Sequence, residues 1–362
     1  MNNLQKARQI INETDKEMAK LFEKRMQAVK LVGEYKKEHG LAVSDKAREE
    51  EIVEANAKFI ADDELRSYYV SFLRSNIEIS KKYQHRMLDS MRVAYSGVEG
   101  AFANIVAERI FPDAKAVGFA DFKSAYNSVV SGECDCAVLP IENSFNGDVG
   151  NVLDLAFFGS LHVSGVYEAE IVQNLLAVKG SSIDEIKTVI SHPQALGQCA
   201  EFIAKHGFKT VEAVNTAVAA KEVAESGRHD IAAIGSSEAA EKFGLKELAT
   251  HINQSGMNST RFAVFTRAQK ASDHTDNRFI MLFTVNNAAG SLGRAISVIG
   301  EHNYNLLALK SRPTKELIWD YYFYAEGEGN INDEKGQQMI AQLSECCSSI
   351  KILGSFEKEI RI

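Results

Sequence analysis

The stretch LQKARQIINETDKEMAKLFEKRMQAVKLVGEYK, residues 4–36, contains a single glycine and no proline. Residues 1–96 contain only Gly33 and Gly40, and the four prolines of the chain all lie beyond them. Because glycine and proline are the residues that most disfavour a helix, this composition predicts helices throughout the segment. It also places a domain boundary near residue 92, where short apolar runs begin to alternate with helical stretches.

One face of the first helix combines apolar and charged residues. Positions 8, 11, 15, 18, 22, 25, 29, 32 and 36 are separated by alternating steps of three and four, which places them on that face. Long basic side chains can extend from an apolar interface into water. This face carries three basic residues, Arg8, Arg25 and Lys36. A third helix at about residues 63–91 carries Ser80 and Gln84 on its inward face. Together they favour a polar pocket inside a helix bundle.

The spacing of these cations separates them into two pockets. At a rise of 1.5 Å per residue, Arg8 lies about 26 Å from Arg25. Lys36 lies about 17 Å from Arg25, a gap that two long side chains can bridge around a compact ligand. We therefore expect Arg8 to serve a second pocket across a two-fold homodimer.

Residues 1–91 resemble the all-helical AroQ-type chorismate mutases. The matching positions are Leu4, Arg8, Ile11 and Asp15 of an LxxxRxxIxxxD motif, then Arg25, Lys36 at the end of VGxxK, Asp45, Arg48 and Glu49 of DxxRE, and Ser80 and Gln84 of SxxxQ. The resemblance implies that chorismate is bound by Arg8, Arg25, Lys36, Asp45, Arg48, Glu49, Ser80 and Gln84.

The same resemblance implies the role of each side chain. Chorismate rearranges to prephenate without a nucleophile or cofactor, so the site must only fold the substrate and stabilise developing charge. Arg25 and, from the partner chain, Arg8 would bind the two carboxylates. Lys36 and Gln84 would donate to the ether oxygen, and Glu49 would accept from the ring hydroxyl, which makes these three the catalytic residues.

Residues 92–268 contain a pattern of repeated β and α units. Runs such as CAVLPIE, IKTVIS and DIAAIG alternate with helical stretches. Polar residues follow several of these strands or begin helices, in SGVEGAFAN, PIENS, SHPQALGQ, NTAVAA and NSTRF. Each stretch is ordinary as a polar loop or a capped helix start, but open α/β sheets also bind ligands at such positions.

In this order the five stretches resemble prephenate dehydratase, which carries PIENS, HPQAL and TRF signatures. The resemblance implies two α/β lobes, similar to periplasmic binding proteins, with prephenate in the cleft. Thr260 would be catalytic by donating a hydrogen bond to the departing hydroxyl. The candidates for binding prephenate are Glu142, Asn143, Ser144, Asn258, Ser259 and Arg261, and Glu142 is a second acid if burial raises its pKa. Ala101 and Ala103 stand where relatives often carry hydroxyl residues, which predicts weaker substrate binding there.

Residues 278–356 read as strand, helix, strand, strand, helix and strand, with the third strand at residues 318–325. This βαββαβ order is that of a ferredoxin-like unit. The segment resembles an ACT domain, which pairs with a copy of itself and in dehydratases binds L-phenylalanine. The implied effector-binding residues are Gly290, Ser291, Leu292, Lys310, Ser311 and Arg312. Because Lys310 stands where relatives usually have an acid, we expect weaker inhibition by phenylalanine, unless Lys310 points to solvent and the change is silent.

The sequence therefore predicts a multidomain chain with an all-α AroQ-type three-helix mutase domain at 1–91, an α/β two-lobed periplasmic-binding-like dehydratase domain at 92–268 and an α+β ferredoxin-like ACT domain at 277–357. The expected function is conversion of chorismate to prephenate and of prephenate to phenylpyruvate in phenylalanine biosynthesis, with feedback by L-phenylalanine. Arogenate dehydratase activity and a noncatalytic metabolite sensor are the alternatives.

Composition limits the expected partners. A net charge of −8 disfavours nucleic acid, which needs a basic surface. The sequence lacks both a run of the roughly 18 apolar residues that cross a membrane and a signal-peptide core, so we expect a cytoplasmic protein. The close pairs Cys134/Cys136 and Cys346/Cys347 fit no zinc or dithiol spacing, so neither a metal nor a cofactor is expected. The remaining partners are the two substrates, the effector and a homodimer or larger homo-oligomer.

Overall fold

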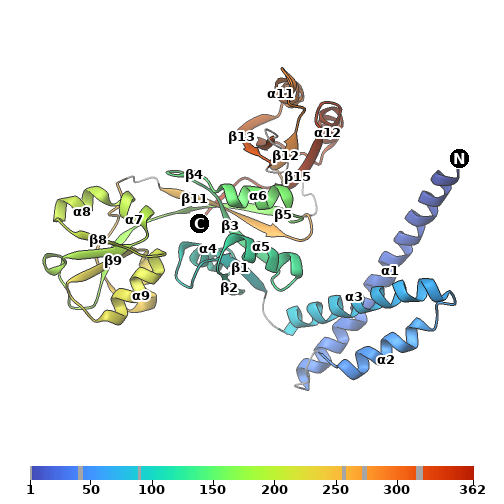
Figure 1. The fold of residues 1–362 in the computed structure, drawn as a ribbon, viewed down its shortest axis with the longest axis horizontal. Coiled ribbons are helices and arrows are strands. Elements are labelled where there is room, and N and C mark those ends of the chain that lie inside the picture. The colour runs from blue at the N-terminus through green and yellow to red at the C-terminus, as the bar shows by residue number, and fades with distance from the viewer. Residues whose placement is uncertain (1, 40–43, 89–90, 255–257, 271–274, 315–320) are drawn as a thin grey trace. The chain divides into compact units, whose positions relative to one another are not determined.

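The computed structural model describes residues 2–39, 44–88, 91–254, 258–270, 275–314 and 321–362 (Figure 1). It divides the chain into two compact units, residues 1–92 and 93–362, at the position where the composition changes. Residues 89–90 of the predicted third helix and residues 318–320 of the predicted strand lie outside the described residues. Within the described residues, no helix combines the length and hydropathy that a membrane crossing requires.

The first unit consists of three helices, as predicted: α1 (Asn3–Glu38), α2 (Lys46–Ala57) and α3 (Asp63–Leu88). The side chain of Asp45 caps α2 by accepting a hydrogen bond from the backbone N–H of Arg48. Asp63 and Glu64 lie in the first turn of α3, where negative charge favours the helix dipole. The helices pack so that α3 contacts both α1 and α2.

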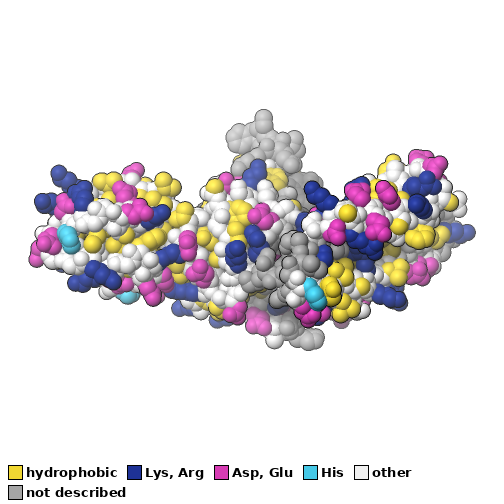
Figure 2. All heavy atoms as spheres, turned by 90° about the horizontal axis from the view of Figure 1, so that it is seen from below, with side chains coloured by type: hydrophobic (Ala, Val, Ile, Leu, Met, Phe, Trp, Pro, Cys, Tyr) yellow, Lys and Arg dark blue, Asp and Glu magenta, His cyan; other side chains and the backbone are white. Residues whose placement is uncertain are grey.

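The N-terminal part of α1 projects away from the other two helices (Figure 1). Ile11, Met18 and Phe22, on the face predicted to be buried, are 57%, 44% and 42% exposed. Figure 2 shows hydrophobic side chains exposed between charged ones on the helical part of the molecule, at the right of the view. One chain therefore does not bury this face. Apolar surface of this extent is typical of an interaction surface.

The second unit begins with a lobe built on a seven-stranded sheet in the order β16-β5-β11-β3-β1-β2, with β4 paired to β3. Its elements are β1 (Arg92–Ser96), α4 (Phe102–Ile110), β2 (Lys115–Phe119), α5 (Phe122–Ser131), β3 (Cys136–Asn143), β4 (Gly147–Asp148), α6 (Gly150–Phe158), β5 (His162–Glu170), β11 (Ser259–Thr266) and β16 (Ile360–Arg361). The chain reaches β11 only after building the second lobe, so two connections join the lobes. The central strand β3 is largely buried and pairs in parallel with β1 and antiparallel with β11.

The second lobe is a five-stranded sheet in the order β10-β6-β9-β7-β8. Its elements are β6 (Asn174–Ala177), a 3₁₀ turn (Ile183–Glu185), β7 (Thr188–Ser191), α7 (Pro193–Gln198), α8 (Ala200–His206), β8 (Lys209–Glu212), α9 (Thr216–Ser226), β9 (Ile231–Gly235), α10 (Ser237–Phe243) and β10 (Lys246–Ala249). Strands β7, β8 and β9 are parallel, which directs the starts of α7 and α9 to the same edge of the sheet.

The C-terminal segment forms a four-stranded antiparallel sheet in the order β13-β14-β12-β15 with two helices. Its elements, in βαββαβ order, are β12 (Arg278–Thr284), α11 (Ser291–Glu301), β13 (Asn305–Pro313), β14 (Tyr321–Glu328), α12 (Glu334–Cys346) and β15 (Ser349–Phe356). One face of this sheet packs with α11 and α12 around a core that includes Phe279, Met281 and Met339.

The other face of the C-terminal sheet shares a core with the first lobe. Ile280, Leu282 and Tyr322 of the C-terminal sheet belong to the same buried cluster as Leu139 and Phe265 of the lobe. The approach is close: a Cβ atom on Gly354 of β15 would lie 1.9 Å from the carbonyl oxygen of Val163 on β5. The two sheets are thus one folded body, and glycine at 354 is required for their contact.

Replacing Gly354 with alanine is therefore expected to destabilise residues 93–362 by at least about 2 kcal/mol, because backbone must move to admit the methyl group. The measurement is thermal unfolding followed by calorimetry. Gly300→Ala is the matched control, since a Cβ at this glycine of α11 meets nothing within 4 Å and alanine favours a helix. Equal unfolding midpoints for the two variants would contradict the packing described here.

Candidate functional sites

A strip of polar side chains joins α1 to α3 in the helical unit. Arg25 donates from Nη1 to Ser80 Oγ at 2.5 Å and to the Asn76 carbonyl at 3.5 Å. Along α3, Gln84 donates from Nε2 to the Val29 carbonyl at 3.0 Å. Ser80 and Gln84 are buried, and burial lowers the pKa of Arg25. The structure thus places three of the predicted chorismate-binding residues between the same two helices.

Glu49 lies at the start of α2 and is bonded to α3. Its Oε2 accepts from Lys81 Nζ at 3.0 Å, and its Oε1 accepts from Ser44 Oγ at 3.2 Å. The hydrogen bond from Lys81 holds the pKa of Glu49 below its ordinary value, so the carboxylate is charged at neutral pH and can only accept hydrogen bonds. The sequence analysis did not single out Lys81, because no spacing rule distinguishes it from the solvated lysines of α3.

The remaining residues predicted for this site are more exposed. Arg48 pairs through Nη1 with Glu51 Oε2 at 2.7 Å on the surface of α2, and the Asp45 carboxylate is used as a helix cap. Lys36 is partly buried near the end of α1, whereas Arg8 is exposed on the projecting part of that helix. The structure therefore does not bring Arg8 to Arg25 within one chain.

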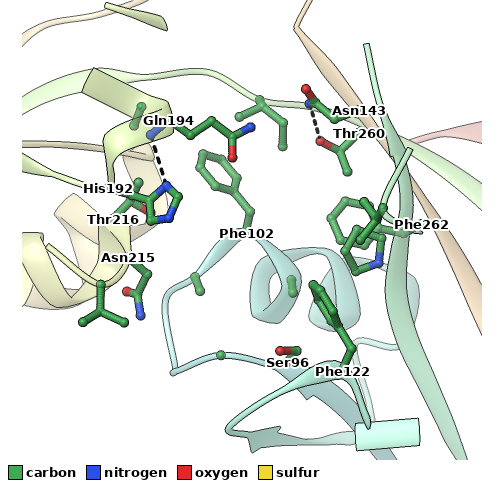
Figure 3. Close-up of a pocket in the computed structure, with 18 of the residues that line it drawn as sticks. Ser96, Phe102, Phe122, Asn143, His192, Gln194, Asn215, Thr216, Thr260 and Phe262 are labelled. Atoms are coloured by element: carbon green, nitrogen blue, oxygen red, sulfur yellow. Dashed lines mark hydrogen bonds between the residues drawn. The ribbon is translucent and has the colours of Figure 1, made fainter. Parts of the chain in front are cut away.

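A cavity of about 510 Å³ lies between the two lobes of the second unit. Figure 3 shows side chains of both lobes converging on it. The first lobe contributes Ser96, Phe102, Phe122, Asn143, Thr260 and Phe262, and the second contributes His192, Gln194, Asn215 and Thr216. The lining combines apolar side chains with hydroxyl, amide and imidazole groups.

Thr260 and Asn143 form the polar centre on the first lobe. They are register partners on β11 and β3, and Asn143 Nδ2 donates to Thr260 Oγ1 at 2.9 Å. Asn143 Oδ1 accepts the backbone N–H groups of Phe145 and Asn146 at 3.0 and 2.9 Å, which fixes the orientation of the amide. Because Thr260 Oγ1 accepts from Asn143, its own O–H proton is available to donate into the cavity.

The other predicted neighbours of this pair support it from outside the cavity. Asn258 accepts from Asn143 Nδ2 at 3.0 Å through its side-chain oxygen and is almost completely buried. Ser144 Oγ accepts from the backbone N–H of Ser259 at 3.0 Å, which ties the loop after β3 to the start of β11. Asn258, Ser144 and Ser259 do not belong to the cavity lining, so their direct role in binding a ligand is not supported by this geometry.

Glu142 and Arg261 correct the sequence-based expectation most clearly. Each is adjacent in sequence to a cavity residue, but neither lines the cavity, and both bond residues of the C-terminal sheet, so both face that sheet. Arg261 bonds Glu142 at 2.9 Å and Glu326 at 2.6 Å. Burial raises the pKa of Glu142, but the hydrogen bonds from Lys310 and Arg261 outweigh it and lower the pKa overall. Glu142 is therefore neither placed nor protonated as an acid, and Arg261 is not available to a carboxylate in the cavity.

Helix N-termini take the place of cationic side chains around the cavity. Among the described residues that line it, none is a lysine, arginine, aspartate or glutamate. Helix α4 begins at Phe102 without a side-chain cap, and its neighbours Ala101 and Ala103 also line the cavity. Thr216 begins α9 on the opposite lobe. Asn215 caps α9 by accepting from the Val218 N–H, so the uncapped N–H groups lie mainly at the start of α4, and the dipoles of both helices favour bound anions.

The sequence analysis missed the cavity residues of the second lobe. The stretches that contain His192, Gln194, Gln198 and Asn215 were noted as capped helix starts or ligand-binding positions, but none of these four residues was assigned to the substrate. Gln173, at the connection between the lobes, also lines the cavity; its Nε2 reaches Gln198 at 3.5 Å. The available signal was their position after the parallel strands β7 and β8, where ligands bind in open sheets.

The predicted effector residues divide between two environments. Gly290 has φ +82° and precedes α11 without a side-chain cap. Ser291 is buried, Leu292 packs against the C-terminal core, and Ser311 is exposed on β13.

The charged groups of β13 instead face the first lobe. Arg312 donates to both carboxylate oxygens of Asp154, at 2.8 and 3.1 Å, and Lys310 bonds Glu142 at 2.7 Å. Lys310 therefore neither points to solvent nor has a free ammonium group.

Comparison with known proteins matches both units. The family described as chorismate mutase type II matches residues 7–85, and prephenate dehydratase matches residues 93–270. An arogenate dehydratase/prephenate dehydratase of Arabidopsis thaliana is 34% identical, covering 74% of this chain and 72% of that relative. The bifunctional chorismate mutase/prephenate dehydratase of Aquifex aeolicus is 28% identical over 99% of both chains. The crystal structure of an Arthrobacter aurescens prephenate dehydratase with L-Phe has a TM-score of 0.68 and 25% identity, covering 74% of this chain and 90% of that one.

The two matches define a chain that joins a mutase-type helical domain to a dehydratase-type two-lobed domain. The chain belongs to the family of bifunctional chorismate mutase/prephenate dehydratases.

The ionisation of Glu49 gives a prediction for the helical site. Lys81→Met removes the hydrogen bond that favours the charged carboxylate, so the pKa of Glu49 should rise, as measured by NMR titration of its carboxyl carbon. Any activity that needs ionised Glu49 should then be lost at a higher pH as the solution is acidified. Arg74→Met is the control, because Arg74 also joins α3 to α2 but bonds Glu50. An unmoved Glu49 titration in Lys81→Met would show that another group sets its charge.

Proposed function

We propose that the helical unit converts chorismate to prephenate. Arg25 binds one carboxylate, with Ser80 holding its guanidinium toward α3. Lys36 and Gln84 donate to the ether oxygen as the C–O bond breaks, and charged Glu49 accepts from the ring hydroxyl. Because the rearrangement is pericyclic, positioning and charge stabilisation are sufficient for it.

The mutase site is completed by a second copy of the chain. The exposed apolar face of α1, which includes Ile11, Met18 and Phe22, is the surface that a homodimer would bury. A partner helix on this face would deliver Arg8 of the partner subunit to the pocket that holds Arg25. Asp45 and Arg48 lie at its α2 side and complete the proposed chorismate site.

Complementation between chains tests this arrangement. Arg8→Ala and Arg25→Ala proteins should each lose at least about 100-fold in mutase kcat/KM, because each lacks one carboxylate contact. Refolded together, they should recover part of the activity, since one pocket of the mixed dimer contains both arginines. Mixed dimers verified by mass spectrometry that stay inactive would contradict a shared pocket.

The two-lobed unit is proposed to dehydrate prephenate to phenylpyruvate. The observation that carries this proposal is the Asn143–Thr260 pair at the cavity, in which Thr260 Oγ1 accepts from Asn143 and keeps its own proton to donate. The bond from C4 to its hydroxyl breaks as the C1 carboxylate leaves as CO₂, and the electron pair released by decarboxylation completes the aromatic ring. Thr260 stabilises the departing hydroxide by a hydrogen bond, and the hydroxide takes up one proton from solvent to become water. The N-termini of α4 and α9 bind the two carboxylates of prephenate, one on the ring and one on the side chain.

Arogenate dehydration is the second candidate, because the Arabidopsis relative carries both names. Arogenate has an ammonium group where prephenate has a keto group. The ratio of kcat/KM for the two substrates decides between them, and a ratio in favour of arogenate would assign the chain to that reaction.

The C-terminal sheet is proposed to act as an ACT domain that binds L-phenylalanine, as the Arthrobacter relative was crystallised with it. The uncapped start of α11 at Gly290, with Ser291, Leu292 and Ser311, is the proposed effector site. Lys310 and Arg312, whose charges are bonded to the first lobe, are omitted from it.

The two activities should be separable. Thr260→Val should lower dehydratase kcat at least about 100-fold and leave mutase activity near wild type, while Lys36→Met should do the reverse. Chorismate consumption and phenylpyruvate formation by purified protein measure both. Thr266→Val, at the other end of β11, is the control for Thr260. Loss of both activities in one folded variant would refute the division, and a wild-type protein that turns over neither substrate would favour a sensor.

A further inference from the structure

The loop that carries Asn143 contains a pair of like charges. Strands β3 and β4 form a short hairpin, in which Glu142 is the register partner of Asp148 and Asn143 is the partner of Gly147. Like charges directly opposite each other in a sheet are destabilising. Glu142 is 28% exposed and Asp148 is 32% exposed, so solvent screens their repulsion only in part. The hairpin that orients Asn143 therefore needs a cation at its base.

Lys310 supplies that cation from the C-terminal sheet. Its Nζ donates to Glu142 Oε1 at 2.7 Å and also to Asp148 Oδ1. The ammonium lies 5.6 Å from the centre of the Tyr324 ring, and the side chain is only 17% exposed. One side chain of β13 thus joins both strands of the hairpin, so the base of the hairpin is held by a residue 162 positions later in the chain.

Arg261 reinforces the same hairpin from β11. It bonds Glu142 and is itself held by Glu326 of β14 and by Glu359 of the C-terminal tail, at 2.6 Å each. Lys310 is nevertheless the only cation among the described contacts that bonds both Glu142 and Asp148. Removing Lys310 leaves Glu142 paired with Arg261 but takes away the ammonium partner of Asp148.

We propose that Lys310 is a positioning residue for the dehydratase reaction. By neutralising the repulsion between Glu142 and Asp148 it keeps the β3–β4 hairpin closed, and the closed hairpin holds the Asn143 amide against Thr260. Lys310 does not line the cavity, so it acts on the reacting groups through Asn143. It also connects β13 of the proposed effector domain to the hairpin that carries Asn143. This inference rests on the proposed dehydratase function.

Charge relief at a second site tests the proposal. Lys310→Met should lower dehydratase kcat about 10-fold with a smaller change in KM, and Lys310→Glu should lose more because it adds a third carboxylate. Asp148→Asn in the Lys310→Met background should restore kcat to within about threefold of wild type. A role of Lys310 in packing alone would not be rescued by this change, because Asp148→Asn adds no contact to the C-terminal sheet.

Two controls separate the possible failures. Lys351→Met removes another lysine that crosses from the C-terminal sheet, where it donates to the carbonyls of Ala156 and Gly159 at the end of α6, and it should leave kcat within about twofold. Mutase activity and unfolding midpoints report whether each variant is folded. An unchanged kcat in Lys310→Met, or a loss that Asp148→Asn does not reverse, overturns the proposal. A wild-type protein without dehydratase activity would instead refute the proposed function on which it rests.

Discussion

The antiparallel pairing of β3 with β11 is the constraint on which the second unit depends. It places Asn143 opposite Thr260 and Glu142 opposite Arg261. Because successive side chains of a strand alternate between faces, the first pair must face the cavity when the second faces the C-terminal sheet. The cavity-facing pair and the ionic contacts to the C-terminal sheet therefore lie on the two faces of one register, and a shift by one residue would exchange them.

This register also explains which site residues the sequence could predict. The PIENS and NSTRF stretches contain the cavity residues Asn143 and Thr260, and the helical spacing placed Arg25 on the face of α1 that bonds Ser80 of α3. Neither pattern reveals which of two adjacent polar residues faces a ligand, since that depends on strand pairing between segments 117 residues apart. Arg261 was assigned to the substrate for this reason. The cavity residues His192, Gln194 and Gln198 were missed because a capped helix start and a ligand-binding helix start have the same sequence signature.

The fold was predictable where local rules dominate. Absence of proline and near absence of glycine defined the helical unit, and the order of elements defined the βαββαβ segment. Tertiary contacts were not predictable in the same way. Nothing local indicates that Ile280 and Tyr322 would join the core of the preceding lobe, because the alternating strands of the C-terminal sheet have an apolar residue on both faces. Burial of the α1 face was expected, with Arg8 serving a pocket across a homodimer, and the single chain leaves Ile11, Met18 and Phe22 exposed.

The two junctions of the chain differ in a way that bears on how its activities can be coupled. Residues 1–92 and 93–362 are two compact units, and within the second the C-terminal sheet and the first lobe share one core and several ion pairs. A ligand can influence a distant site only by favouring one of two arrangements that both sites sense. A sheet packed directly on the lobe that contains β3 and β11 meets that condition, because displacement of β13 or β14 also displaces the partners of Glu142 and Arg261. The contacts described here therefore give the C-terminal sheet a physical means of controlling dehydration through the same strands that hold Asn143 and Thr260.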